Sequence, residues 1–375
     1  MTPDQLTTAA IEQYLGSGDF NGLPAYALTR PGLIDLDTLR PMLRSLVEAG
    51  TLSVSFGTVH PNPHIRALKD PPAAFQVGEL EAATDDRFVI YPTASALAGA
   101  VNQKVYAGRP YSLRLALGAP QLDFASFDLA VLDHYQRDPR YNLWTNDVQA
   151  TLAIGDASFE SATFPEKHKV LLQSFGFSYS PPRKRAVAVF FTDLHRLTPE
   201  HQGLWLTFEV EGEYKLHPDF ARAAIMGDWE LKASLRDAFV VELHTISAMT
   251  QAIGWGPLFR NAFKEPPREL ALLIRPTVAA FNDFVLALDK MMSDNISLSF
   301  FPASVPRETE ELRDDGKTVV RSRGSIALLA DWLARSFRTP DPAPLQETLA
   351  TFRKVRKLRQ SPAHALNPDA YDESI

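Results

Sequence analysis

The sequence predicts a multidomain α+β protein. Its 375 residues exceed the usual size of a single hydrophobic core, so two or three domains are expected. Apolar residues alternate in several short runs of the middle region, as in strands, and recur at three- and four-residue spacing toward both ends, as in helices. The 28 prolines favour many loops and joints. We expect three domains, over residues 1–72, 73–265 and 266–375.

Composition excludes several classes of site and location. The chain has no cysteine, which rules out disulfides and thiolate zinc sites. No run of about eighteen apolar residues is present to cross a bilayer. The first residues lack the basic and apolar segments of a signal peptide. We therefore expect a cytoplasmic protein that has no membrane partner, cofactor or bound metal.

Residues 1–72 show three helical patterns followed by two strands. The helices are expected over Thr8–Leu15, over Leu23–Leu28, and from a cap at Asp37 to Ala49. Alternation predicts a strand over 51–56, and a proline-containing loop separates it from a second strand over Ile65–Leu68. This order of elements resembles the winged-helix fold. The resemblance implies contact with DNA or with another protein through this domain.

The third helix of this domain presents few charges that suit DNA. It offers Arg40 and Arg44, with Glu48 close to them, which is a weak electrostatic footprint for a duplex. This favours protein contact over nucleic acid. His60 and His64 are four residues apart, but the prolines between them bar a helix and no third ligand is near. No metal site is expected there.

The middle region, 73–265, predicts a mixed α/β domain. Alternating or valine-rich runs predict strands over Arg87–Tyr91, Tyr111–Leu117, Ala186–Phe191 and Leu204–Val210. Helical spacing predicts helices over Phe124–Tyr135 and Leu235–Ile253. Thr198 followed by Pro199 predicts the start of a helix. We therefore interpret the acidic and histidine side chains around it as part of local structure, in preference to a functional site. No glycine-rich phosphate loop, nucleophile elbow or zinc-helix motif occurs.

Residues 266–375 predict a bundle of helices after a joint at Pro266–Pro267. A long helix is expected over Leu270–Asp294 and a second over Ser325–Phe337, with a polar loop over 302–323 between them. A third helix begins near Pro342.

The third helix changes character along one face. Its apolar stripe from Leu345 to Phe352 continues into Arg356 and Arg359, where a core helix would place leucine. An arginine on an inward face needs a partner, because an unpaired buried charge is expensive. We expect that partner to be a carboxylate of the first helix, Asp289 or Asp294.

The end of this helix is strongly basic. Five of the seven residues from Arg353 to Arg359 are Lys or Arg, and His364 follows Arg359 after a gap of four. Residues 320–364 hold nine basic and three acidic side chains, although the whole chain carries a net charge of −7. Arginine suits phosphate, and histidine suits acid–base chemistry near neutrality. The alternative is a solvated helix face without a ligand.

Because Arg359 and His364 lie at the end of a basic helix in a helical region, residues 266–375 resemble the HEPN superfamily of small helical bundles. Many members are metal-independent RNases with an Arg-x4–6-His motif, often assembled across a dimer interface. By this resemblance Arg359 and His364 match the motif, and Asp289 or Asp294 matches an acidic residue of an earlier helix. Gln360 is larger than the small polar residue common after the motif arginine, and Pro362 inside the gap is a departure.

Two functions follow as hypotheses. The resemblance implies a metal-independent endoribonuclease, of the toxin or anti-phage effector type, that acts as a homodimer. Arg356 and Arg359 would hold the scissile phosphate and His364 would transfer protons. The basic residues expected to bind RNA are Arg353, Lys354 and Lys357. The alternative is a non-enzymatic winged-helix regulator or interaction subunit with a helical dimerisation module.

Overall fold

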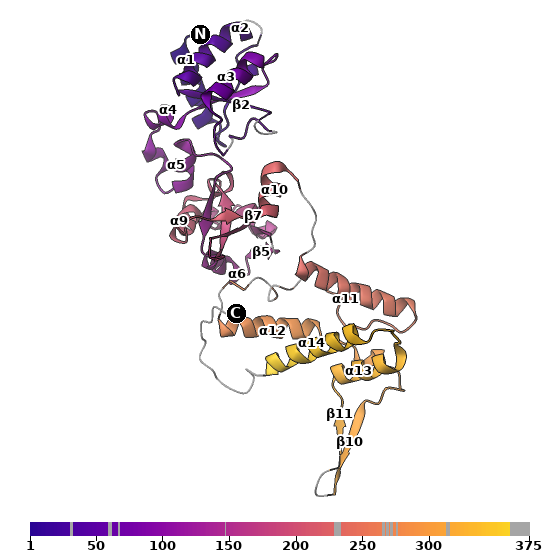
Figure 1. The fold of residues 1–375 in the computed structure, drawn as a ribbon. Coiled ribbons are helices and arrows are strands. Elements are labelled where there is room, and N and C mark those ends of the chain that lie inside the picture. Colours follow the sequence, from indigo (N-terminus) through magenta and orange to yellow (C-terminus); the bar gives the residue numbers. More distant parts are fainter. Residues whose placement is uncertain are drawn as a thin grey trace. The chain divides into compact units, whose positions relative to one another are not determined.

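The computed structural model contains helices and strands throughout, as expected for an α+β protein (Figure 1). It describes the chain apart from residues 31–32, 59–61, 67, 147, 229–233, 265–266, 268–269, 271–272, 275–276, 313–315 and 361–375. The chain forms two compact units, Met1–Glu230 and Leu231–Ile375. Among the described helices, none combines the length and apolarity that a bilayer crossing demands.

The first unit begins with helices around a small antiparallel sheet of order β1-β3-β2. The elements are α1 (Pro3–Gly16), β1 (Leu23–Pro24), η1 (Ala25–Ala27), α2 (Leu36–Glu48), β2 (Leu52–Phe56), α3 (Ala73–Ala82) and β3 (Phe88–Pro92). Thr2 and Gln5 form a capping box, which starts α1 earlier than expected. The cap of α2 is Asp35, which accepts a hydrogen bond from the Thr38 N–H. The expected cap, Asp37, lies in the first turn of the helix instead.

The predicted third helix and the strand after it are confirmed as α2 and β2, but two other predictions for this region were wrong. Leu23–Leu28 contains β1 and a 3₁₀ turn in place of a helix. Ile65–Leu68 forms no strand in its described residues, and β3 pairs with β2 instead. All five residues of β3 are buried, and a central place in the sheet, between β1 and β2, removes this apolar surface from water. The sheet therefore crosses the expected boundary at 72/73.

The rest of the first unit surrounds a six-stranded antiparallel sheet, in which β4-β8-β7-β6-β5 are neighbours and β9 pairs with β7. The strands are β4 (Phe124–Phe127), β5 (Tyr141–Thr145), β6 (Gln149–Ile154), β7 (Leu171–Tyr179), β8 (Arg185–Phe190) and β9 (Lys215–Leu216). The helices are α4 (Ala94–Ala98), η2 (Gln103–Tyr106), α5 (Pro110–Ala116), η3 (Leu129–Leu132), α6 (Asp133–Gln136), α7 (Asp156–Phe159), η4 (Glu166–His168), α8 (Phe191–Leu194), α9 (Pro199–Thr207) and α10 (Pro218–Met226).

Three expectations for this region were wrong. Residues 111–116 lie in α5 and Leu117 is its C-cap, since Pro110 starts a helix and Tyr111 and Leu115, four apart, are both buried. Residues 204–207 belong to α9. The Thr198 cap was correctly predicted, and the helix that it starts extends to Thr207. Residues 124–135 begin as strand β4, which pairs with the valine-rich β8. The strands predicted over 87–91 and 186–191 are confirmed as β3 and β8, although Phe191 begins α8.

The second unit is mainly helical. Its elements are α11 (Leu235–Ala252), α12 (Val278–Met291), η6 (Leu298–Phe300), β10 (Glu308–Leu312), β11 (Thr318–Ser322), α13 (Ser325–Ser336) and α14 (Ala343–Gln360). The helices expected over 235–253, over 325–337 and from about 342 are confirmed. The helix expected over Leu270–Asp294 is shorter, with Thr277 as its cap. The expected loop over 302–323 was wrong, because it contains the hairpin β10–β11.

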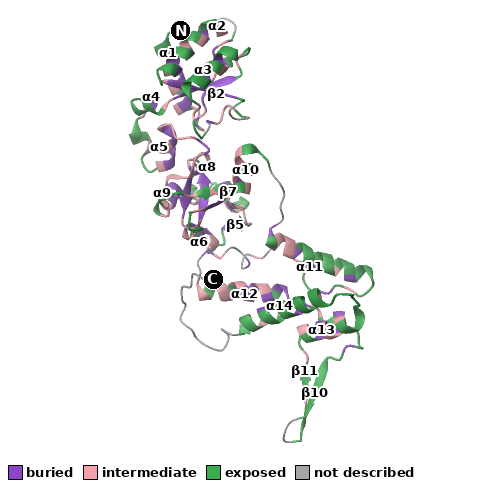
Figure 2. Cartoon of the chain, in the orientation of Figure 1, coloured by how far each residue is buried: buried purple, intermediate pink, exposed green. Residues whose placement is uncertain are grey.

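One hydrophobic core holds the second unit together. Val240 and Leu243 of α11 pack in the same cluster as Trp332 of α13 and Leu349 of α14. Helix α11 therefore shares a core with the C-terminal helices, although it precedes the expected boundary at 265/266. Figure 2 shows how burial is concentrated where these helices face one another, while the hairpin is exposed. Pro266 of the expected joint lies outside the described residues.

Candidate functional site

Helices α12 and α14 bring four of the predicted site residues together. Val285 of α12 and Val355 of α14 belong to one small apolar cluster, which aligns the two helices. Directly after Val355 and one turn beyond it, α14 presents Arg356 and Arg359. They meet Asp289, in the last turn of α12, and Asp294, just after it. We call these four residues the arginine–aspartate cluster. The predicted pairing of the two arginines with carboxylates is confirmed.

Each arginine of the cluster bridges both aspartates. Arg356 contacts Asp294 Oδ1 through Nη2 at 2.6 Å and Asp289 Oδ1 through Nε at 3.2 Å. Arg359 Nη1 donates to Asp289 Oδ2 at 2.6 Å and also to Asp294 Oδ2. Ser293, which the sequence interpretation missed, donates its hydroxyl to Asp289 Oδ1 and accepts from Arg356 Nη2 at 2.8 Å. This network fixes both guanidinium groups in position.

Burial explains why the cluster needs both arginines. The side chain of Asp289 is 0% exposed, and a buried carboxylate is tolerated only when it is paired and hydrogen-bonded. Burial alone would raise the pKa of Asp294, but hydrogen bonds from Arg356 and Arg359 outweigh it and hold that pKa below its ordinary value. The hydrogen bond to Asp289 raises the pKa of Arg359, against the opposing effect of burial. Both shifts favour the charged forms of Asp294 and Arg359.

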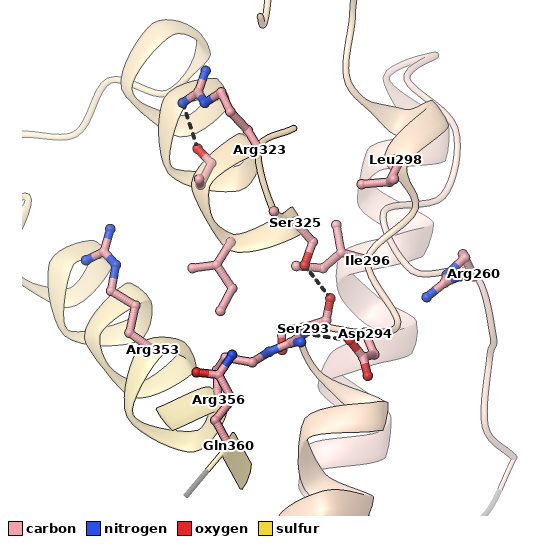
Figure 3. Close-up of a pocket in the computed structure, with 13 residues that line it drawn as sticks. Arg260, Ser293, Asp294, Ile296, Leu298, Arg323, Ser325, Arg353, Arg356 and Gln360 are labelled. Atoms are coloured by element: carbon pink, nitrogen blue, oxygen red, sulfur yellow. Dashed lines mark hydrogen bonds and ion pairs between the residues drawn. The ribbon is translucent and has the colours of Figure 1, made fainter. Parts of the chain in front are cut away.

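A pocket of 580 Å³ opens beside the cluster (Figure 3). Its lining includes Arg356 and Asp294 of the cluster together with Arg260, Arg323 and Arg353. Figure 3 shows Arg353 and Arg356 on α14, with Arg260 across the view from Arg353. Ser293 and Ser325 also line the pocket, and the Ser325 hydroxyl donates to the Ser293 carbonyl at 2.7 Å. Four arginines and one aspartate give this lining a positive formal charge.

The arginines of the pocket differ in how they are paired. Arg323 donates to Asp331 at 2.9 Å and is largely buried. Arg260 and Arg353 are exposed, and neither has a carboxylate partner among the residues that the structure describes. Because the arginine–aspartate cluster is formally neutral, Arg260 and Arg353 supply the uncompensated charge. A guanidinium without a carboxylate remains free to bind a phosphate.

The remaining predicted residues fall into two groups. Lys354 and Lys357 are exposed on α14 but do not line the pocket. His364 lies outside the described residues, so its relation to Arg359 is not part of the structure. Arg260 and Arg323 were missed by the sequence interpretation, because both lie in loops where no periodicity marks a functional face. The described parts of the chain hold no cluster of three or more metal-ligating His, Asp or Glu side chains.

His201 of the first unit is buried in a network of hydrogen-bonded side chains. Trp205 Nε1 donates to the Tyr135 hydroxyl at 2.9 Å, and that hydroxyl is hydrogen-bonded to His201 Nδ1 at 2.8 Å. Burial lowers the pKa of His201 to about 4. His201 is therefore neutral and buried, as part of the start of α9. This agrees with the interpretation of that segment as a helix start.

Comparison with known proteins gives no family for this chain. No protein-family model, no curated protein and no solved structure matches it.

Proposed function

We propose that the second unit is a metal-independent endoribonuclease whose active site contains Arg356, Arg359 and His364. The observation that carries this proposal is the position of Arg356. It belongs both to the rigid arginine–aspartate cluster and to the wall of the arginine-lined pocket. The packing of α12 and α14 in one unit with α13 supports the HEPN resemblance on which the roles of Arg359 and His364 rest.

RNA would bind along the basic side of α14. Arg353, with Arg260 across the pocket, attracts the phosphate backbone, while Lys354 and Lys357 extend this basic surface. The hydrogen bonds described for Arg356 use Nε and Nη2, which leaves its Nη1 to approach a phosphate oxygen. Asp289 and Asp294 hold the arginines in place, so no reorganisation is needed as charge develops on the phosphate.

The reaction is an internal transfer. The ribose 2′-hydroxyl attacks the adjacent phosphorus, a new O2′–P bond forms, and the P–O5′ bond breaks. His364 takes part in the proton transfer between the attacking and leaving oxygens. The products carry a 2′,3′-cyclic phosphate and a 5′-hydroxyl. A toxin or anti-phage effector role is the cellular setting that the family resemblance implies.

The chemistry can be tested with a substrate that lacks the nucleophile. Full-length protein is incubated in EDTA with an RNA oligonucleotide and with its all-2′-deoxy counterpart. We expect cleavage of the RNA alone, with cyclic-phosphate ends, and a loss of about 10²-fold or more in rate for Arg359→Ala. Arg335→Ala, at an exposed arginine of α13, is the matched control and keeps its activity. Cleavage of the deoxy substrate, or none of RNA in EDTA, would refute the proposal.

A second candidate function is an interaction subunit, and the surface of α11 favours it. This helix exposes Leu235, Val241 and Met249, and its C-cap exposes Ile253, each more than half exposed. Exposed apolar side chains gathered on one helix are typical of a protein-binding surface. DNA or protein contact through the winged-helix-like region belongs to the same candidate function. Binding of a protein partner that Met249→Glu abolishes, in a protein that does not cleave RNA, would support it.

A further inference from the structure

The hairpin β10–β11 carries backbone hydrogen-bonding groups that no described strand uses. Its strands pair with each other over Glu308–Ser322 and Leu312–Thr318. Every residue of β10 is exposed, and in β11 only Val319 is half-buried. Figure 1 shows the hairpin projecting from the helices of the second unit. A two-stranded hairpin alone in water is marginally stable, so this arm gains from additional strands.

Hydrogen-bond alternation identifies the groups at each free edge. The Arg323 N–H donates to the Arg307 carbonyl at 2.8 Å, so this pair is hydrogen-bonded across the hairpin. In an antiparallel ladder hydrogen-bonded and non-hydrogen-bonded pairs alternate. Thr318, Val320 and Ser322 therefore direct their N–H and C=O groups away from β10. Glu308, Glu310 and Leu312 do the same on the other edge.

The two edges differ in charge. Pairing β10 with β10 of another molecule about its centre would set Glu310 directly opposite Glu310, and like charges directly opposite destabilise a sheet. The outward residues of β11 carry no charge, and Val320 is 55% exposed. The neighbouring Arg321 is already paired with Glu311 at 3.2 Å. The edge of β11 is therefore the one that tolerates a copy of itself.

We propose that two copies of this chain associate through β11, which pairs antiparallel with β11 of the second copy. The pairing is centred on Val320, so that Val320 faces Val320 and Thr318 faces Ser322. The result is a four-stranded sheet of order β10-β11-β11-β10 about a two-fold axis, a closed arrangement that cannot extend into a filament. The proposal goes beyond RNA cleavage and does not depend on it.

Proline substitution tests the edge without disturbing the hairpin. Val320→Pro removes an N–H that faces the free edge and leaves the bonds between β10 and β11 in place. Glu310→Pro does the same on the opposite edge and is the matched control. The mass of the full-length protein is measured by light scattering over a dilution series. We expect dimers for wild type and Glu310→Pro, and monomers for Val320→Pro. A monomeric wild type, a dimeric Val320→Pro, or dissociation by both variants would overturn the proposal.

A cysteine at the same position provides a second measurement. Because the chain has no cysteine, a disulfide formed by Val320→Cys can only join two molecules. Directly opposed hydrogen-bonded residues have Cα atoms about 5.5 Å apart, which a disulfide can span. Under mild oxidation we expect Val320→Cys to form a covalent dimer and Glu310→Cys to stay monomeric on a non-reducing gel. Equal crosslinking of both variants would contradict the proposed register.

Discussion

At the scale of single residues, charge placement is what the sequence predicted best. Arg356 and Arg359 continue an apolar stripe, so elementary electrostatics required a carboxylate partner, and Asp289 and Asp294 are that partner. Ser293 was not predictable, because a serine carries no periodic signal and its role depends on both helices being in place. Arg260 escaped prediction for the same reason, since only the tertiary structure brings its loop to the pocket.

The arginine–aspartate cluster should be important for stability. Asp289→Asn keeps the shape of the side chain but leaves two arginines with one charged partner. Since both arginines are about a third exposed, we expect a loss of roughly 2–4 kcal/mol, toward the lower part of the range for a broken buried pair. Urea denaturation of the second unit measures it. Asp331→Asn is the control, because Asp331 also binds two arginines but its side chain is 19% exposed, against 0% for Asp289, so this change should affect stability less. Equal losses would contradict the assigned burial effect.

The carboxyl of Asp193 should give the first unit a distinctive pH dependence. Burial raises the pKa of Asp193 from 3.8 to about 6. A raised folded-state pKa gives a stabilising contribution that is full below 3.8 and is lost as pH rises through about 6, in total about 3 kcal/mol. Asp193→Asn should therefore melt at a higher temperature than wild type at pH 7.5, with the difference disappearing near pH 4. A difference that is constant with pH would show that ionisation is not involved.

At the scale of elements, helices with clear start signals were predicted, whereas alternating runs gave the right strand at β2 and β3 but the wrong element at α5 and α9. The Thr198 cap and the helices α13 and α14 follow directly from local sequence. Residues 111–117 alternate like a strand, yet Pro110 and the burial of Tyr111 and Leu115 fit a helix equally well. Alternation over so few residues cannot decide between the two. The hairpin β10–β11 was missed because its charged strands bury almost nothing, so no apolar pattern marks them.

The approach of α10 to β7 depends on one glycine. A Cβ atom at Gly176 would lie 2.2 Å from Cδ1 of the buried Phe220 ring, so the strand and helix can meet only without a side chain there. Gly176→Ala should cost about 1–3 kcal/mol of stability by overpacking. Gly203→Ala in α9 meets nothing within 4 Å and should be neutral or slightly stabilising. Thermal melting of both variants checks this, and a neutral Gly176→Ala would contradict the packing.

At the scale of the whole molecule, the α+β class followed from the sequence but the extent of each compact part did not. Helix α11 looks like a continuation of the middle region along the chain, whereas Val240 and Leu243 pack with Trp332 and Leu349 far beyond it. Strand β3 likewise lies between β1 and β2, which precede it by tens of residues. Long-range pairing of this kind depends on matching surfaces, and neither composition nor proline positions reveal it.

The division into two units predicts independent folding. Residues 1–230 and 231–375, produced separately, should each give a cooperative thermal transition by circular dichroism, because each has its own hydrophobic core. The complete arginine–aspartate cluster and the pocket lie within 231–375. That fragment should therefore retain any RNA cleavage. A fragment 231–375 that shows no cooperative transition would contradict the assignment of separate cores.

The measurement that tests the central claim most directly is the rate of RNA cleavage in EDTA by wild type and by His364→Ala. His364 is the proposed proton-transfer group, and it is not one of the four residues of the arginine–aspartate cluster. If the second unit is a metal-independent endoribonuclease, wild type should cleave RNA and His364→Ala should be slower by about 10²-fold or more. Equal rates for the two proteins would contradict the claim.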